Sequence, residues 1–103
     1  MRWDDTVRFK ALQPQMLLVI SRAEEIYARF DTPLWITSAN DRQHKEGSPH
    51  YVGKALDFRT HNLPQGHVRE IYGLLVGALG PEFVVLLEDE GQANEHIHCQ
   101  YQG

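Results

Sequence analysis

The apolar run at residues 83–87 restricts the possible folds of this chain more than any other feature. All five residues are apolar and two are valines, a pattern typical of a strand covered on both faces or nearly so. Residues 88–91 are acidic and end in glycine, so we expect a turn there, and residues 96–101 return as the last strand. A covered strand needs neighbouring strands and helices, so the chain must fold in layers.

The rest of the chain is expected to supply two helices and two further strands. Residues 12–30 carry apolar side chains at steps of three and four, on one helical face: Leu12, Met16, Ile20, Ala23, Tyr27 and Phe30. Residues 34–38 and the apolar-rich run within 54–60 are expected to be strands. A second helix begins near Asn62, a possible N-cap, and stops at Gly80 and Pro81; its buried face comprises Val68, Ile71, Tyr72, Leu75, Val76 and Leu79.

This order of elements predicts one α+β domain over residues 1–103, with a small, mostly antiparallel sheet and two main helices. Alternation in the last strand puts two groups of side chains on opposite faces: His96, His98 and Gln100 on one, and Ile97, Cys99 and Tyr101 on the other. We expect Cys99 to be a small core residue.

Composition excludes several classes of partner. The net charge of -4 leaves no basic face for nucleic acid. No apolar run approaches the length of about 20 residues that a membrane span needs. The first residues lack the apolar core of a signal peptide, so the protein is expected to be cytoplasmic as synthesised. The single cysteine excludes an internal disulfide. The oligomeric state does not follow from the sequence.

Residues 48–57 combine groups that can bind a metal ion. His50 lies in the expected loop and Asp57 seven positions later in the expected strand, with Gly53 between them to let the backbone turn. Imidazole and carboxylate both hold zinc. Near the C-terminus, Glu95, His96 and His98 add two more imidazoles and a carboxylate. Catalytic zinc usually has three protein ligands and one open position, so His50, Asp57 and His98 suit an open site.

Two motifs resemble those of the zinc D-alanyl-D-alanine peptidases, which include the vancomycin-resistance D,D-dipeptidases and several phage endolysins. The Hedgehog signalling domain shares their fold. The matching residues are Ser48, His50, Gly53, Ala55 and Asp57, followed by Glu95 and His98. The resemblance spans residues 34–101 and implies a fold of the Hedgehog and D,D-peptidase type.

The resemblance also implies roles for individual residues. His50, Asp57 and His98 would hold zinc, and Glu95 would be the general base that activates the attacking water. His96 shares the strand face of His98, so geometry alone allows it to be a ligand, but the resemblance favours support of the tetrahedral intermediate. Two loop residues complete the expected site: Arg42, which would polarise the scissile carbonyl or remain a solvated loop residue, and Ser48, which would bind substrate.

These expectations favour a zinc metallopeptidase that cleaves short peptides containing D-amino acids, such as the stem peptides of peptidoglycan. Such an enzyme would reach the cell wall with a phage particle, through a holin or after lysis. A cytoplasmic D,D-dipeptidase is the alternative that needs no export. A zinc-bearing binding module without turnover, as Hedgehog illustrates, is the alternative from another class. Whether the bond is cut inside a peptide or at its end stays open.

Overall fold

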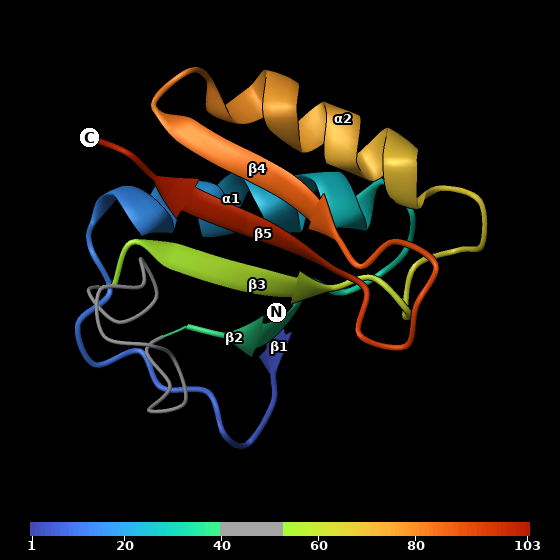
Figure 1. The fold of residues 1–103 in the computed structure, drawn as a ribbon, viewed down its shortest axis with the longest axis horizontal. Coiled ribbons are helices and arrows are strands. Elements are labelled where there is room, and N and C mark those ends of the chain that lie inside the picture. The colour runs from blue at the N-terminus through green and yellow to red at the C-terminus, as the bar shows by residue number, and fades with distance from the viewer. Residues whose placement is uncertain (40–52) are drawn as a thin grey trace.

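The computed structural model describes residues 1–39 and 53–103 as two helices beside a five-stranded mixed sheet (Figure 1). The elements in chain order are β1 Arg2–Trp3, α1 Gln15–Ala28, β2 Trp35–Ser38, β3 Ala55–Arg59, α2 Val68–Leu79, β4 Phe83–Glu88 and β5 His96–Tyr101. The predicted α+β class with two helices is confirmed, and the strand boundaries near β2, β3 and β5 lie within one residue of those expected.

The sheet has the strand order β1-β2-β3-β5-β4. The pairings of β2 with β3, β3 with β5, and β4 with β5 are antiparallel, whereas β1 runs parallel to β2. The two-residue strand β1 was not expected from the sequence, because nothing in so short a segment has a period. The sheet is therefore mixed, with β1 and β4 as its edges.

Both helices lie behind the sheet in the view of Figure 1 and cover one of its faces. The hydrophobic core lies between the helices and the sheet. Its fully buried residues include Tyr27, Phe58, Ile71 and Ile97. Cys99 is also fully buried there, as expected. No helix of the described residues lies on the other face of the sheet, the helix-free face, and polar side chains stand on it.

Among the described residues, helices cover only one face of β4, whereas the sequence predicted a strand covered on both faces or nearly so. Phe83 and Val85 point into the core, whereas Leu86 is 42% exposed. The reason is position: β4 is an edge strand, and the helices pack against a single face of the sheet. Leu86 and the neighbouring Val84 therefore stand on the helix-free face.

Helix α2 begins later than the sequence predicts. Its N-cap is His67, and Asn62 instead donates a hydrogen bond from Nδ2 to the Pro33 carbonyl at 3.0 Å. Gly66, at φ 87°, interrupts any helix that starts earlier, because this conformation lies outside the right-handed helical region. Val76 was expected on the buried face of this helix but is 46% exposed. The buried residues of α2 are only Ile71, Leu75 and Leu79, fewer than the six expected.

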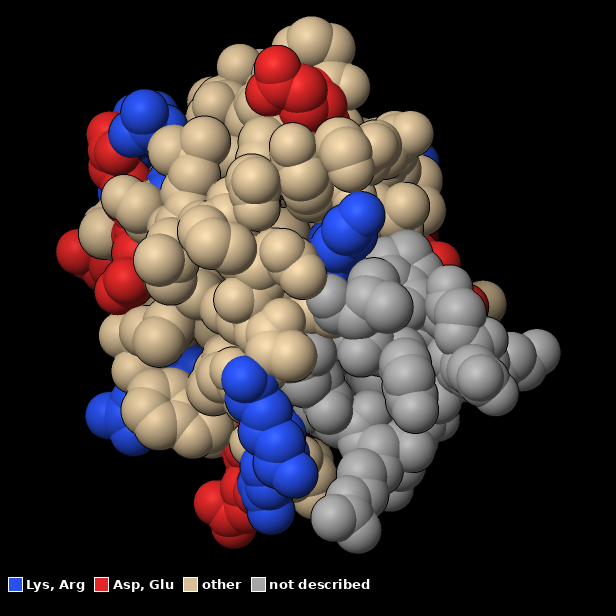
Figure 2. All heavy atoms as spheres, turned by 90° about the vertical axis from the view of Figure 1, so that its left-hand side faces the viewer, with Lys and Arg blue, Asp and Glu red and all other residues tan. Residues whose placement is uncertain are grey.

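On the face drawn in Figure 2, positive and negative side chains lie beside one another in several places, and no large patch of one sign is visible. The expectation that nucleic acid is not a partner stays a prediction. Neither helix among the described residues is long and apolar enough to cross a membrane.

Gly53 fixes the backbone at the entrance to β3. Its φ is 75°, a left-handed conformation that side chains disfavour, and its carbonyl accepts a hydrogen bond from the Gln13 amide at 2.8 Å. A Cβ atom built at this position would lie 1.8 Å from the Ala11 carbonyl oxygen. The chain before α1 thus packs directly on the turn that leads to Asp57.

We predict that Gly53→Ala lowers the free energy of unfolding by about 2 kcal/mol or more, because strain and a backbone collision act together. Gly73→Ala is the control: Gly73 lies inside α2 with open space around it, so the change should stabilise the protein by about 0.5 to 1 kcal/mol. Urea denaturation measures the free energy of unfolding of both variants. Equal changes in the two variants would contradict the strained, closely packed conformation assigned to Gly53.

Candidate metal centre

Asp57 and His98 come together because β3 and β5 pair in one register. The two residues are directly opposite in that antiparallel pair, and both side chains stand on the helix-free face. His98 Nδ1 lies 2.8 Å from Asp57 Oδ1. The side chains are only 10% and 14% exposed, so solvent screens their interaction weakly.

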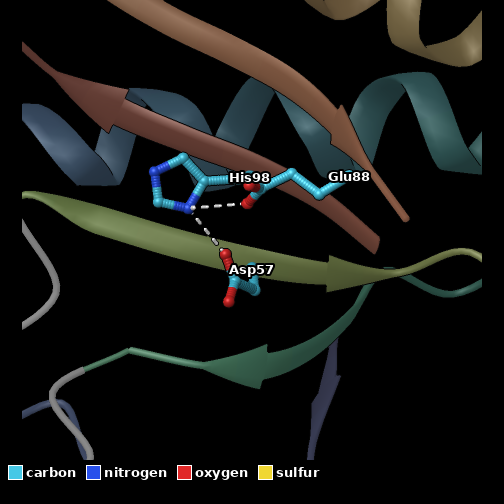
Figure 3. A group of neighbouring side chains, drawn as sticks. All are labelled: Asp57, Glu88 and His98. Carbon is cyan, nitrogen blue, oxygen red and sulfur yellow. Dashed lines mark hydrogen bonds and ion pairs between the residues drawn. The ribbon is translucent and has the colours of Figure 1, made fainter. Parts of the chain in front are cut away.

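Glu88, at the end of β4, provides a third donor (Figure 3). It pairs with His96 across the hairpin, and its Oε1 lies 3.9 Å from His98 Nδ1. Ligand atoms of Asp57, Glu88 and His98 all lie within 4.8 Å of one another. One imidazole and two carboxylates from three adjacent strands therefore converge on one point.

The separations of these donors suit a metal ion. Zinc binds nitrogen and oxygen at about 2.0 to 2.2 Å, so donors around a tetrahedral ion lie about 3.3 to 3.6 Å apart. The distances of 2.8 and 3.9 Å from His98 Nδ1 to the two carboxylates fall on either side of that range. Small side-chain rotations would satisfy the geometry, and the metal's identity is not fixed by these donors alone.

Gln100 orients the His98 ring. Its Oε1 lies 2.8 Å from His98 Nε2, so this nitrogen donates its proton and leaves Nδ1 facing the carboxylates. Burial lowers the pKa of His98, but hydrogen bonds to Asp57 and Gln100 and the charges of Asp57 and Glu88 outweigh it and raise the pKa. The cluster therefore attracts positive charge, and a metal cation would replace the proton.

His96 supports the same carboxylates from the neighbouring position on the face. Its Nε2 lies 3.1 Å from Glu88 Oε1 and 3.9 Å from Asp57 Oδ2. Its Nδ1 donates to the Asn94 carbonyl at 2.8 Å, because a carbonyl oxygen can only accept. Burial lowers the pKa of His96, but the Asn94 carbonyl and the charges of Asp57 and Glu88 raise it overall. Its expected role at the intermediate stays a prediction.

Glu95 stands at the entrance to β5, after a turn in which its amide donates to the Gln92 carbonyl at 3.1 Å. Glu95 is three residues before His98, an odd spacing that would put the two side chains on opposite faces of a straight strand, and this turn provides a bend between them. Its carboxylate accepts hydrogen bonds from Thr60 Oγ1 and, at 2.8 Å, from the Gly91 amide. The Thr60 bond first, and the Gly91 bond next, lower the pKa of Glu95. The carboxylate is held in its ionised form.

A pocket of about 450 Å³ opens beside these groups. Asp57, Glu95 and His96 line it together with Arg59 and Asp4. Cys99 is on the other face of the sheet, and burial, followed by the charge of Asp57, raises the pKa of its thiol. Among the described residues, the site therefore has nitrogen and oxygen donors and an open side toward the pocket.

Three expected site residues, Arg42, Ser48 and His50, lie outside the described residues. Asp57 and His98 are brought together, and Glu95 and His96 line the adjoining pocket. Sequence reasoning assigned Glu88 to a turn and missed it as a donor. The signal was the hairpin register: alternation that puts His96 and His98 on one face puts Val84, Leu86 and Glu88 on the same face.

No protein-family model, curated protein or solved structure matches the chain.

We predict that Asp57→Ala and His98→Ala weaken zinc binding at least about 100-fold, since each removes a converging donor, and that Glu88→Gln weakens it about 10- to 100-fold. Isothermal titration with zinc measures the affinities. His67→Ala is the control, because His67 is exposed and contacts Glu70 on α2. Unchanged affinity in both Asp57→Ala and His98→Ala would show that the metal binds elsewhere.

We predict that Thr60→Val raises the pKa of Glu95 toward its ordinary value, because the hydroxyl is the largest contributor to its lowering. A lowered pKa in the folded state stabilises the protein above the unfolded pKa, and this stabilisation is lost as pH falls through the folded pKa. The stability difference between wild type and variant should therefore shrink on acidification. NMR titration of the Glu95 carboxyl measures the pKa, and Thr6→Val, in the same pocket, is the control.

Proposed function

We propose that the protein is a zinc-dependent metallopeptidase acting on short peptides that contain D-amino acids, with peptidoglycan stem peptides as the substrate class. One observation carries the proposal: Asp57 and His98 face each other at 2.8 Å, beside a pocket that Asp57, Glu95 and His96 line. Asp57, Glu95 and His98 belong to the two motifs that resemble the D-alanyl-D-alanine peptidases, and His96 lies within the second motif. A fold of the Hedgehog and D,D-peptidase type is part of the same proposal.

In this function three protein ligands would hold the metal and leave the fourth position to water. Asp57 and His98 would be two of them, and the third would be either His50, which the resemblance implies, or Glu88, whose carboxylate lies within 4.8 Å of both. Zinc supplies Lewis-acid polarisation of a carbonyl and lowers the pKa of a coordinated water to about 7. Glu95, ionised and fixed by Thr60 and Gly91, accepts the proton of the attacking water and returns it to the leaving amine. His96 Nε2 lies 3.1 Å from Glu88 Oε1, and its N–H would turn from that carboxylate to support the developing negative charge.

A binding module without turnover is the second candidate. Its support is the hydrogen bonding of Glu95, whose two carboxylate oxygens are engaged by Thr60 and by the Gly91 amide. A base is most effective when its pKa lies near the working pH, and these bonds lower the pKa of Glu95. Turnover would require at least one of the bonds to be released on substrate binding.

The route to the substrate follows from the resemblance. A phage or prophage product would meet peptidoglycan during lysis or from a phage particle, whereas a D,D-dipeptidase would act on free dipeptide in the cytoplasm. The two differ in substrate size, so digestion of purified peptidoglycan and of free D-alanyl-D-alanine separates them. Mass spectrometry of the products identifies the bond that is cut.

We predict that Glu95→Gln keeps zinc affinity within about 3-fold of wild type and lowers kcat at least about 100-fold, because the amide cannot accept the proton. Wild-type activity should follow a bell-shaped pH profile whose acid limb reports a carboxyl with a lowered pKa. Glu24→Gln, an exposed change on α1, is the control. Undiminished hydrolysis by Glu95→Gln would favour another base, and absence of hydrolysis in wild type with zinc bound would favour the binding module.

A further inference from the structure

We propose that Arg59 binds the C-terminal carboxylate of the substrate, so that the pocket accepts short peptides with a free C-terminus and releases their last residue. This inference rests on the proposed peptidase function and adds the mode of cleavage to it. Arg59 belongs to neither motif of the resemblance. The inference comes from its place in the pocket, from the contact of its guanidinium with Trp35 and from the charges around it.

Arg59 is positioned by the same strand that carries Asp57. It is the last residue of β3 and, two residues after Asp57, stands on the same face of the sheet. It is directly opposite His96 in the β3 and β5 pair, and it lines the pocket with Asp57 and Glu95. Buried Tyr27 donates a hydrogen bond to its carbonyl at 2.8 Å, which anchors its backbone to α1.

The guanidinium of Arg59 stacks on an indole that is itself held in place. Its Cζ lies 5.2 Å from the centre of the Trp35 ring, and Trp35 Nε1 donates to Asp4 Oδ1 at 2.7 Å. Within residues 1–39 and 53–103, no carboxylate forms an ion pair with Arg59. Stacking engages the flat face of a guanidinium and leaves the N–H groups at its edge to bind a carboxylate in a bidentate manner.

The other charges in the pocket are already engaged. Asp4 accepts from Trp35, Glu95 accepts from Thr60 and the Gly91 amide, and Asp57 lies against His98. Among the described residues that line the pocket, Arg59 is the one Lys or Arg. An anionic group entering the pocket therefore has a single permanent cation to approach.

The strand spacing matches one peptide residue. Asp57 and Arg59 are alternate residues of β3, and the Cα atoms of alternate strand residues lie about 6.6 to 6.8 Å apart. One peptide residue spans about 3.8 Å. A carboxylate one residue beyond a scissile carbonyl near Asp57 is therefore within the reach of the Arg59 side chain, whereas a longer peptide would carry its C-terminus past it. The arrangement favours an exopeptidase over an endopeptidase.

The test compares two substrates on the zinc-loaded protein: an acylated tripeptide ending in D-alanyl-D-alanine and the same peptide as its C-terminal amide. Wild type should prefer the free acid by about 10- to 100-fold in kcat/KM, the range expected for hydrogen bonds to a charged group. Arg59→Gln should lose that preference, mainly through a higher KM for the acid, and Arg59→Lys should retain part of it. Arg22→Gln, on α1 outside the pocket, is the control for loss of a positive charge.

The outcomes separate this inference from the peptidase proposal. Equal hydrolysis of acid and amide by wild type, or an undiminished acid preference in Arg59→Gln, would overturn the role of Arg59 and leave the peptidase intact. If neither peptide is hydrolysed, the peptidase proposal fails, and calorimetric binding of the two peptides decides about Arg59. Acid-selective binding that Arg59→Gln abolishes would still support the carboxylate site, and binding without that selectivity, or no binding, would overturn it.

Discussion

The antiparallel register of β3 and β5 determines which side chains share the site. With Asp57 opposite His98 and Arg59 opposite His96, a carboxylate, two imidazoles and a guanidinium occupy one small area of the helix-free face. A slip of one residue would turn all the polar groups of one strand toward the core, where Phe58 and Ile97 are now fully buried. Core packing on one face therefore holds the polar groups in position on the other.

The electrostatics of this area favour a bound cation. Asp57 and Glu88 bring two negative charges close to the same imidazole nitrogen, and two buried or partly buried carboxylates repel each other unless a positive charge lies between them. Burial lowers the pKa values of His98 and His96, but hydrogen bonds and the charges of Asp57 and Glu88 raise them overall, so both imidazoles hold a proton more readily than usual. Proton and metal compete for one position.

Much of the fold, and part of the site, could be predicted from the sequence. Period-two alternation put His96 and His98 on one face, and the apolar pattern identified both helices. Glu88 was missed because residues 88–91 have the composition of a turn, and Glu88 was therefore assigned to that turn. In the structure, the pairing of β4 with β5 continues through Glu88, which lies opposite His96. The start of α2 was misjudged because Asn62 can cap a helix in principle but is used in tertiary contact with Pro33. Such long-range partners leave no local pattern.

The position of Glu88 at the end of an edge strand has a consequence for exchange dynamics. In the sheet that the described residues form, one side of β4 has no neighbouring strand, so the end of the β4 and β5 hairpin can open locally without disturbing the centre of the sheet. A ligand bond from Glu88 to a metal held by Asp57 and His98 would link that edge to the sheet's interior. Metal binding would then increase the hydrogen-exchange protection of the amides around residues 86–88. The increase would be much smaller for the amides of β3.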